Sequence, residues 1–82
     1  MNREISRRVA EIMALVLGLD EAEAAQANRE RIGSWDSIKH MELMLYLEEE
    51  FQVRFTPEQL ASASDLAGIV RMIENARGPE PN

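Results

Sequence analysis

The sequence predicts a small all-α domain. Apolar residues recur at the 3.6-residue period of a helix in three segments, and no two strand-like stretches are available to pair with each other. We therefore expect a bundle of three main helices plus one short helix, with a long loop between the first and second helices. A chain of 82 residues is the size of one domain, and we place that domain at residues 1–76.

The first helix is predicted to begin after Asn2, which can cap it, and to end before Gly18, a residue suited to the left-handed turn after a helix. Its apolar side chains share one face and are Ile5, Val9, Ile12, Met13 and Val16. The following residues 19–35 include good helix formers but lack an apolar stripe, so we expect a loop with one helical turn.

The second helix is predicted to begin at about Asp36, whose side chain can accept a hydrogen bond from the free N–H groups of a first helical turn. Trp35 and His40 then occupy the two positions of a hydrophobic staple, the apolar contact that fixes how a chain enters a helix. At about 100° per residue, an ordinary core stripe runs along one side of this helix. It comprises Leu43, Met44, Leu47 and Phe51.

The same helix carries more apolar surface than one buried face needs. Ile38, Met41 and Leu45 form a second stripe, turned by roughly a third of a circle from the first. Carboxylates border this stripe on both flanks. An apolar strip between acidic side chains is typical of a docking surface for a basic partner. The predicted docking residues are Ile38, Met41, Glu42, Leu45, Glu48 and Glu49.

The stretch between the second helix and the short helix is predicted to be a connector. Val53 and Phe55 should turn inward, because a lone strand there would be marginal. Thr56 is a good N-cap and a proline follows at the first helical position, so a short helix should begin there and run to about Ala61.

The last helix is predicted to follow a cap formed by Ser64 or Asp65. Its apolar residues share one face and are Leu66, Ile69, Val70 and Ile73, with Met72 beside them. Glycine and proline beyond it cannot extend a helix, so residues 77–82 are predicted to be a disordered tail.

Composition excludes several classes of function. The net charge of −6 opposes binding to nucleic acid and to anionic lipid surfaces. The absence of cysteine excludes disulfides and a thiol nucleophile belonging to the chain, and a single histidine with scattered carboxylates gives no metal-ligand spacing. No signal sequence and no apolar run of about 20 residues is present, so we expect a cytoplasmic protein without stable membrane insertion. We also expect a monomer.

Ser37 is the one candidate for covalent chemistry. A serine nucleophile needs a base within hydrogen-bond reach, and His40 lies three residues on in the same helix. Asp36, however, is next to Ser37 and not behind His40, and so small a bundle suggests no oxyanion hole. We therefore expect no catalytic residue and no enzyme. From local physics alone, the favoured interpretation of Ser37 is a helix-start serine that shares capping duty with Asp36.

The segment Asp36-Ser37-Ile38, followed by a helix that ends with residues 47–51, resembles the Asp-Ser-Leu segment and second helix of acyl carrier proteins. The resemblance spans nearly the whole chain except the tail. It implies that Ser37, next to Asp36, carries 4′-phosphopantetheine derived from coenzyme A. Arg29 and Arg31 lie close enough in sequence to help neutralise a phosphate there, although loop arginines are more often simply solvated.

The resemblance implies a free-standing carrier of acyl groups held as thioesters. Its partners would be a phosphopantetheinyl transferase and acyl-loading and acyl-consuming enzymes with basic docking patches. Trp35, Lys39 and His40 depart from the residues usual in primary fatty-acid carriers, which suggests a specialised lipid or secondary-metabolite pathway. The alternative is an unmodified acidic helical protein-interaction domain in which Ser37 is only a helix cap.

Overall fold

The computed structural model describes residues 3–77 and confirms the predicted all-α bundle. Within this range there is no β-strand, only a single antiparallel bridge between Asn28 and Asp65. Asn2 and most of the predicted tail lie outside the described residues, and Arg77 still belongs to the last helix. The helices are α1 (Arg3–Leu17), α2 (Glu21–Gln26), α3 (Ser37–Phe51), α4 (Pro57–Ser62) and α5 (Leu66–Arg77).

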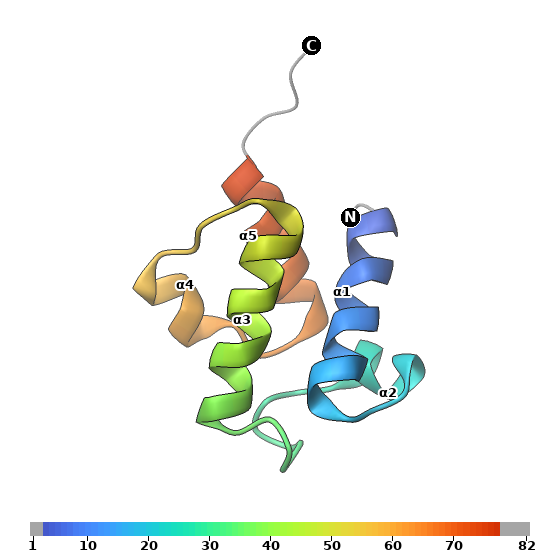
Figure 1. Cartoon of the computed structure of the whole chain (residues 1–82). Helices are drawn as coiled ribbons and strands as arrows, with labels where there is room; N and C mark the ends of the chain where they lie inside the picture. Colours follow the sequence, from blue (N-terminus) through green and yellow to red (C-terminus); the bar gives the residue numbers. More distant parts are fainter. Residues whose placement is uncertain (1–2, 78–82) are drawn as a thin grey trace.

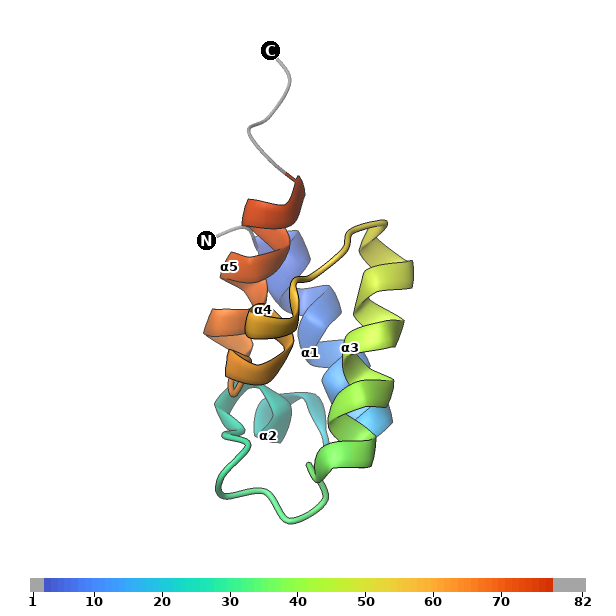
Figure 2. The ribbon, with the colours of Figure 1, turned by 90° about the vertical axis from the view of Figure 1, so that its left-hand side faces the viewer.

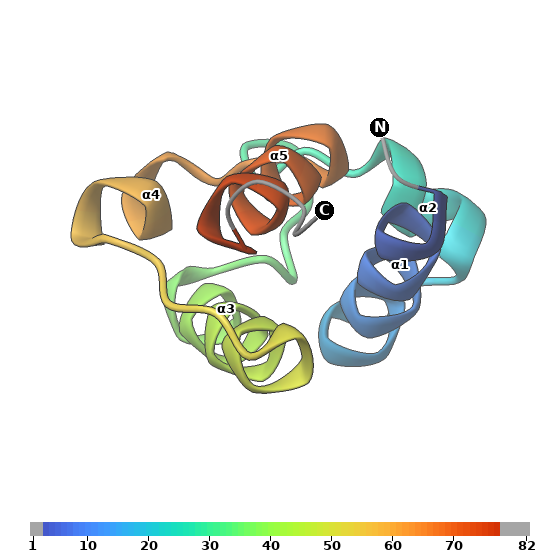
Figure 3. The same cartoon turned by 90° about the horizontal axis from the view of Figure 1, so that it is seen from above.

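The three long helices form the bundle, and the two short helices pack at its periphery. Seen from above, α1, α3 and α5 surround the core, and α4 lies on the side away from α1 (Figure 3). Helix α1 runs in the direction opposite to α3 and α5 (Figure 1). The segment after α2 passes beneath the bundle to the start of α3 (Figure 2). This path brings the loop and the start of α3 to the same end of the molecule.

The core consists of the apolar faces predicted from the helical period. Phe51 and Val16 pack only partly buried at its edge. An aliphatic side chain that is fully buried in this core stabilises the fold by about 1.5–3 kcal/mol, because its apolar surface leaves water. The largest fully buried side chains are Val9, Ile12, Met13, Leu43, Met44, Leu47, Ile69, Val70 and Ile73.

The predicted stop of the first helix is confirmed. Gly18 has a φ of 70°, in the left-handed region that glycine adopts without steric cost. The Leu19 N–H donates to the Ala14 carbonyl at 3.0 Å, which satisfies one of the free carbonyls at the helix end. The chain therefore turns sharply after Leu17 and enters the loop.

The loop after α1 contains a six-residue helix, α2, where the sequence predicted one helical turn. The N-terminus of α2 is stabilised by a capping box. The Asp20 side chain accepts from the Glu23 N–H at 2.7 Å, and the Glu23 side chain accepts from the Asp20 N–H at 3.0 Å. Ala24 is fully buried against the core, so one small side chain anchors the helix.

The remaining connections match their predictions. Val53 and Phe55 are buried, and Thr56 caps α4 in a capping box with Gln59. Of the two candidate caps for α5, Asp65 accepts from the Gly68 N–H at 2.8 Å. No residue of α4 is fully buried, and its contact with the core is through Leu60, which is partly buried.

A matched pair of leucines on α3 tests this division between core and surface. Leu47 is fully buried and Leu45 is 56% exposed. Leu47→Ala should lower the free energy of unfolding by about 2–5 kcal/mol, because it leaves a cavity in the core. Leu45→Ala should change it by no more than about 0.5 kcal/mol. Urea denaturation of both variants measures this, and equal losses would contradict the packing described.

Candidate functional site

Ser37 is the first residue of α3, and its side chain is exposed. The residue before it performs the capping: the Asp36 carboxylate accepts from the Lys39 N–H at 2.8 Å, and Asp36 has extended backbone angles. Within residues 3–77 the Ser37 hydroxyl has no hydrogen-bond partner. The structure therefore gives the capping role to Asp36 and leaves the Ser37 oxygen accessible.

Trp35 and His40 are in contact, as the staple prediction required, but a hydrogen bond joins them. Both are buried, with 2% and 3% of their surface exposed. The Trp35 Nε1–H donates to His40 Nδ1 at 2.9 Å, and His40 Nε2 lies 2.6 Å from the Leu60 carbonyl oxygen. An indole N–H can only donate, so Nδ1 accepts and the imidazole proton sits on Nε2. His40 is therefore neutral and links α3 to α4.

The surroundings of His40 favour this neutral form. Burial lowers the pKa of His40, the Leu60 carbonyl raises it by a smaller amount, and the positive charge of Arg29 lowers it further. Both ring nitrogens are engaged, so His40 is not placed to remove a proton from Ser37. Its role in this geometry is to position α4 and the loop beside Ser37.

An open pocket of about 580 Å³ lies beside Ser37. Three segments meet there: the loop after α2, the start of α3, and the end of α4 with its link to α5. The loop is tied to the link, because the Arg29 N–H donates to the Ser64 carbonyl at 2.9 Å. Of the two loop arginines considered as phosphate partners, Arg29 lines the pocket, whereas Arg31 is exposed and does not. The lining residues are Arg29, Glu30, Trp35, Asp36, Ser37, Ala61, Ser62, Ala63 and Ser64.

The outer face of α3, comprising Ile38, Met41, Leu45 and Tyr46, is exposed. Ile38, next to Ser37, has 71% of its surface accessible. Tyr46 was not among the predicted residues, because it lies beyond the acidic flank of the predicted stripe. Together with Leu45, it lines a shallow groove bordered by Glu42 and Glu49. The molecule thus carries an apolar surface with acidic edges along the helix that begins at Ser37.

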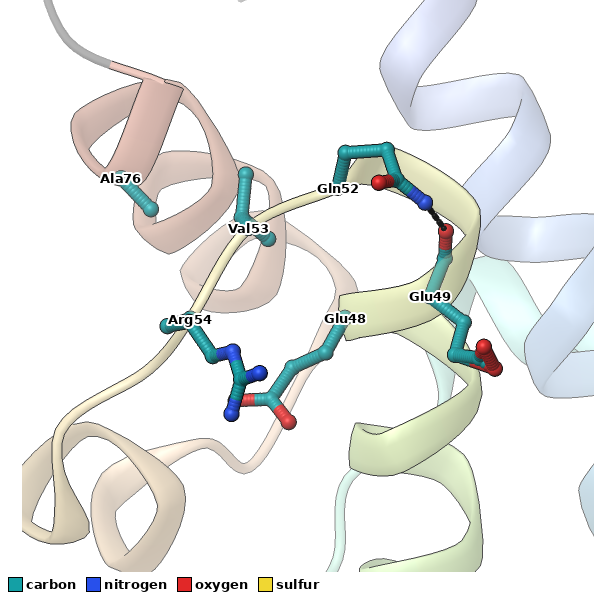
Figure 4. A pocket seen from close by; sticks show the side chains of 6 residues that line it. All are labelled: Glu48, Glu49, Gln52, Val53, Arg54 and Ala76. Carbon is teal, nitrogen blue, oxygen red and sulfur yellow. Dashed lines mark hydrogen bonds between the residues drawn. The ribbon is translucent and has the colours of Figure 1, made fainter.

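The acidic residues near the end of α3 have separate roles. The Glu48 carboxylate accepts from the Phe55 N–H at 2.8 Å, so it holds the connector to α4. In Figure 4 the Glu48 side chain points toward Arg54, and the Glu49 side chain points away from both. Glu50 pairs with Arg8 of α1 at 2.8 Å. Within the described residues neither Glu48 nor Glu49 forms an ion pair, and of the two only Glu48 accepts a side-chain hydrogen bond.

A comparison with known protein families matches residues 7–73 to the family described as phosphopantetheine attachment site. The match covers most of the 82 residues. The chain belongs to this family. It is a carrier domain, and the cofactor of its family is covalently attached 4′-phosphopantetheine. A comparison with curated proteins found no match.

Among residues 3–77, no three histidine, cysteine, aspartate or glutamate side chains gather closely enough to hold a metal ion. None of the helices in that part of the chain is long and apolar enough to cross a membrane.

The buried His40 should make stability depend on pH. An unfolded chain protonates this histidine near pH 6.5, whereas the lowered pKa of the folded state delays protonation to lower pH. Its contribution to the free energy of unfolding is therefore complete above about pH 6.5 and is lost as the pH falls toward the folded pKa. Urea midpoints at about pH 7.5 and 5.5 should fall more for the wild type than for His40→Gln. Equal falls would contradict a buried neutral histidine.

Proposed function

We propose that this protein is an acyl carrier protein in which Ser37 bears 4′-phosphopantetheine. The observation that carries the proposal is the free, exposed hydroxyl at the start of α3, within the segment matched to the phosphopantetheine attachment family. Asp36 caps the helix without help from Ser37, so esterification of Ser37 removes no hydrogen bond that the fold needs. When attached, the group supplies a terminal thiol that holds an acyl group as a thioester.

The residues around Ser37 fit such a group. The hydroxyl borders an open pocket that also contains Arg29, and the chain has no cysteine of its own to supply a thiol. Trp35 and His40 hold the loop and α4 in place beside the attachment point. In this proposal the domain presents its cargo and does not itself catalyse; acyl transfer takes place in the partner enzymes.

We propose that the outer face of α3 docks on those partners. Ile38, Met41 and Leu45 offer exposed apolar surface, and Glu42 and Glu49 border it. Glu48 adds charge at the other edge, although one of its oxygens holds the connector. A phosphopantetheinyl transferase and acyl-handling enzymes with basic patches would be attracted to this face and oriented by it.

The departures at Trp35, Lys39 and His40 support a role in a specialised lipid or secondary-metabolite pathway. Trp35 and His40 form a buried hydrogen-bonded pair, a feature set by two of those departures. A cytoplasmic location and a monomeric state remain predictions from the sequence. The alternative is an unmodified interaction domain in which Ser37 only caps the helix. The geometry favours this alternative less, because Asp36 and not Ser37 forms the cap.

Loading in vitro tests the attachment site. The apo protein is incubated with coenzyme A, magnesium and a promiscuous phosphopantetheinyl transferase, and its intact mass is measured. Wild type and Ser34→Ala should gain one phosphopantetheine, and Ser37→Ala should gain none. Ser34 is an exposed serine in the loop just before α3 and serves as the matched control. Ser37→Ala should fold normally, because its hydroxyl makes no hydrogen bond. Loading of the Ser37→Ala variant, or no loading of folded wild type by any transferase tried, would rule out the proposal.

Charge reversal tests the docking face. Glu42→Arg combined with Glu49→Arg should lower kcat/KM for loading by roughly tenfold at low ionic strength, because it repels a basic partner. The difference should shrink as salt is added, since exposed charges are screened. Glu21→Arg, on α2, is the control and should load at the wild-type rate. Equal rates for all three proteins at low salt would show that this face does not dock the transferase.

A further inference from the structure

Arg29 differs from the other basic residues near Ser37. It is partly buried, and no carboxylate within the described residues forms an ion pair with it. Lys39, by comparison, pairs with Glu42 at 3.7 Å, and Arg31 is exposed outside the pocket. A guanidinium held at a pocket wall without an anionic partner is suited to an anion that arrives from outside the chain.

The backbone holds Arg29 in place. Its N–H donates to the Ser64 carbonyl at 2.9 Å, and its neighbour Asn28 forms the bridge with Asp65. These contacts fix the loop against the link from α4 to α5. The guanidinium is also close enough to His40 for its charge to lower the pKa of that buried imidazole. Arg29 is thus anchored at the end of the bundle where Ser37 lies.

The pocket shared by Arg29 and Ser37 has room for more than one ion. Its volume of about 580 Å³ lies within the range of small-molecule sites. Its lining also includes the hydroxyl-bearing residues Ser62 and Ser64, of which Ser62 donates to the Gln59 carbonyl at 3.2 Å. The carboxylates in the lining are those of Glu30 and Asp36, and Asp36 is engaged as the helix cap. Both carboxylates keep their negative charge, so Arg29 is the one positive side chain in the lining that would offset their repulsion of an anion.

We infer that Arg29 holds the phosphodiester formed at Ser37, so that the first part of the arm rests in this pocket instead of swinging freely from its attachment point. The inference rests on the proposed function. A guanidinium matches the geometry of two phosphate oxygens, which a solvated lysine does not. The pocket is open to solvent, so the distal thiol end remains free to reach partner enzymes. Arg29 is a positioning residue and takes no part in acyl transfer.

The inference predicts that loading stabilises the domain through Arg29. Apo and loaded forms of wild type, Arg29→Gln and Arg31→Gln are compared by thermal unfolding at low salt. Loading should raise the Tm of wild type and Arg31→Gln by about 4 °C, and that of Arg29→Gln by less than about half as much. The gain should fall as salt is added.

A second readout does not depend on stability. In the wild type, the Nε–Hε signal of Arg29 should shift between the apo and loaded forms in a ¹H–¹⁵N spectrum, and the Arg31 signal should not. The ³¹P signal of the phosphodiester should also differ between loaded wild type and loaded Arg29→Gln. If Arg29→Gln fails to fold, the two wild-type spectra and Arg29→Lys provide the test.

The outcomes separate this inference from the proposed function. Absence of any phosphopantetheine on the wild type, seen by intact mass, would overturn the proposed function and the inference with it. A loaded wild type whose Arg29 signal does not shift, or an Arg29→Gln variant stabilised as much as wild type, would overturn the inference alone. If Arg31→Gln also lost the stabilisation, the effect would come from the positive charge of the loop as a whole and not from Arg29. That result would also overturn the inference.

Discussion

The architecture around the attachment site depends on one buried hydrogen-bond chain, from the Trp35 indole through the His40 imidazole to the Leu60 carbonyl. It joins the end of the loop and the first turn of α3, which are neighbours in sequence, to α4, which lies 20 residues further on. No residue of helix α4 is fully buried, although Leu60 packs against the core, so this chain adds a second anchor for α4. A buried polar group without a partner costs about 1–3 kcal/mol, which makes the arrangement specific as well as stabilising.

The different faces of helix α3 make different contacts. One face enters the core, and Glu50 on one border pairs with Arg8 of α1. Glu48 on the other border holds the connector to α4 through the Phe55 N–H. The remaining face is apolar, exposed and edged with carboxylates. Because the other faces fix the helix within the bundle, the exposed face can be used for binding without rearrangement of the fold.

The features predicted from the sequence are those set by local spacing. The core faces followed from the 3.6-residue period, and the cap at Asp36 followed from its place before an amphipathic segment. Helix α2 was underestimated because its capping box, Asp20 and Glu23, lies in a stretch without an apolar stripe. The partner of His40 could not be foreseen, because Leu60 is 20 residues away and reaches it only through the tertiary path of the connector.

The central claim is that the free hydroxyl of Ser37 is where this carrier domain is modified in the cell. Peptide mapping by mass spectrometry, applied to the protein purified from its native cells, tests this most directly. We expect the peptide that contains Ser37 to carry the mass of phosphopantetheine, with fragment ions that localise it to that residue. Localisation to Ser34, Ser62 or Ser64, or a peptide that is unmodified throughout growth, would contradict the account.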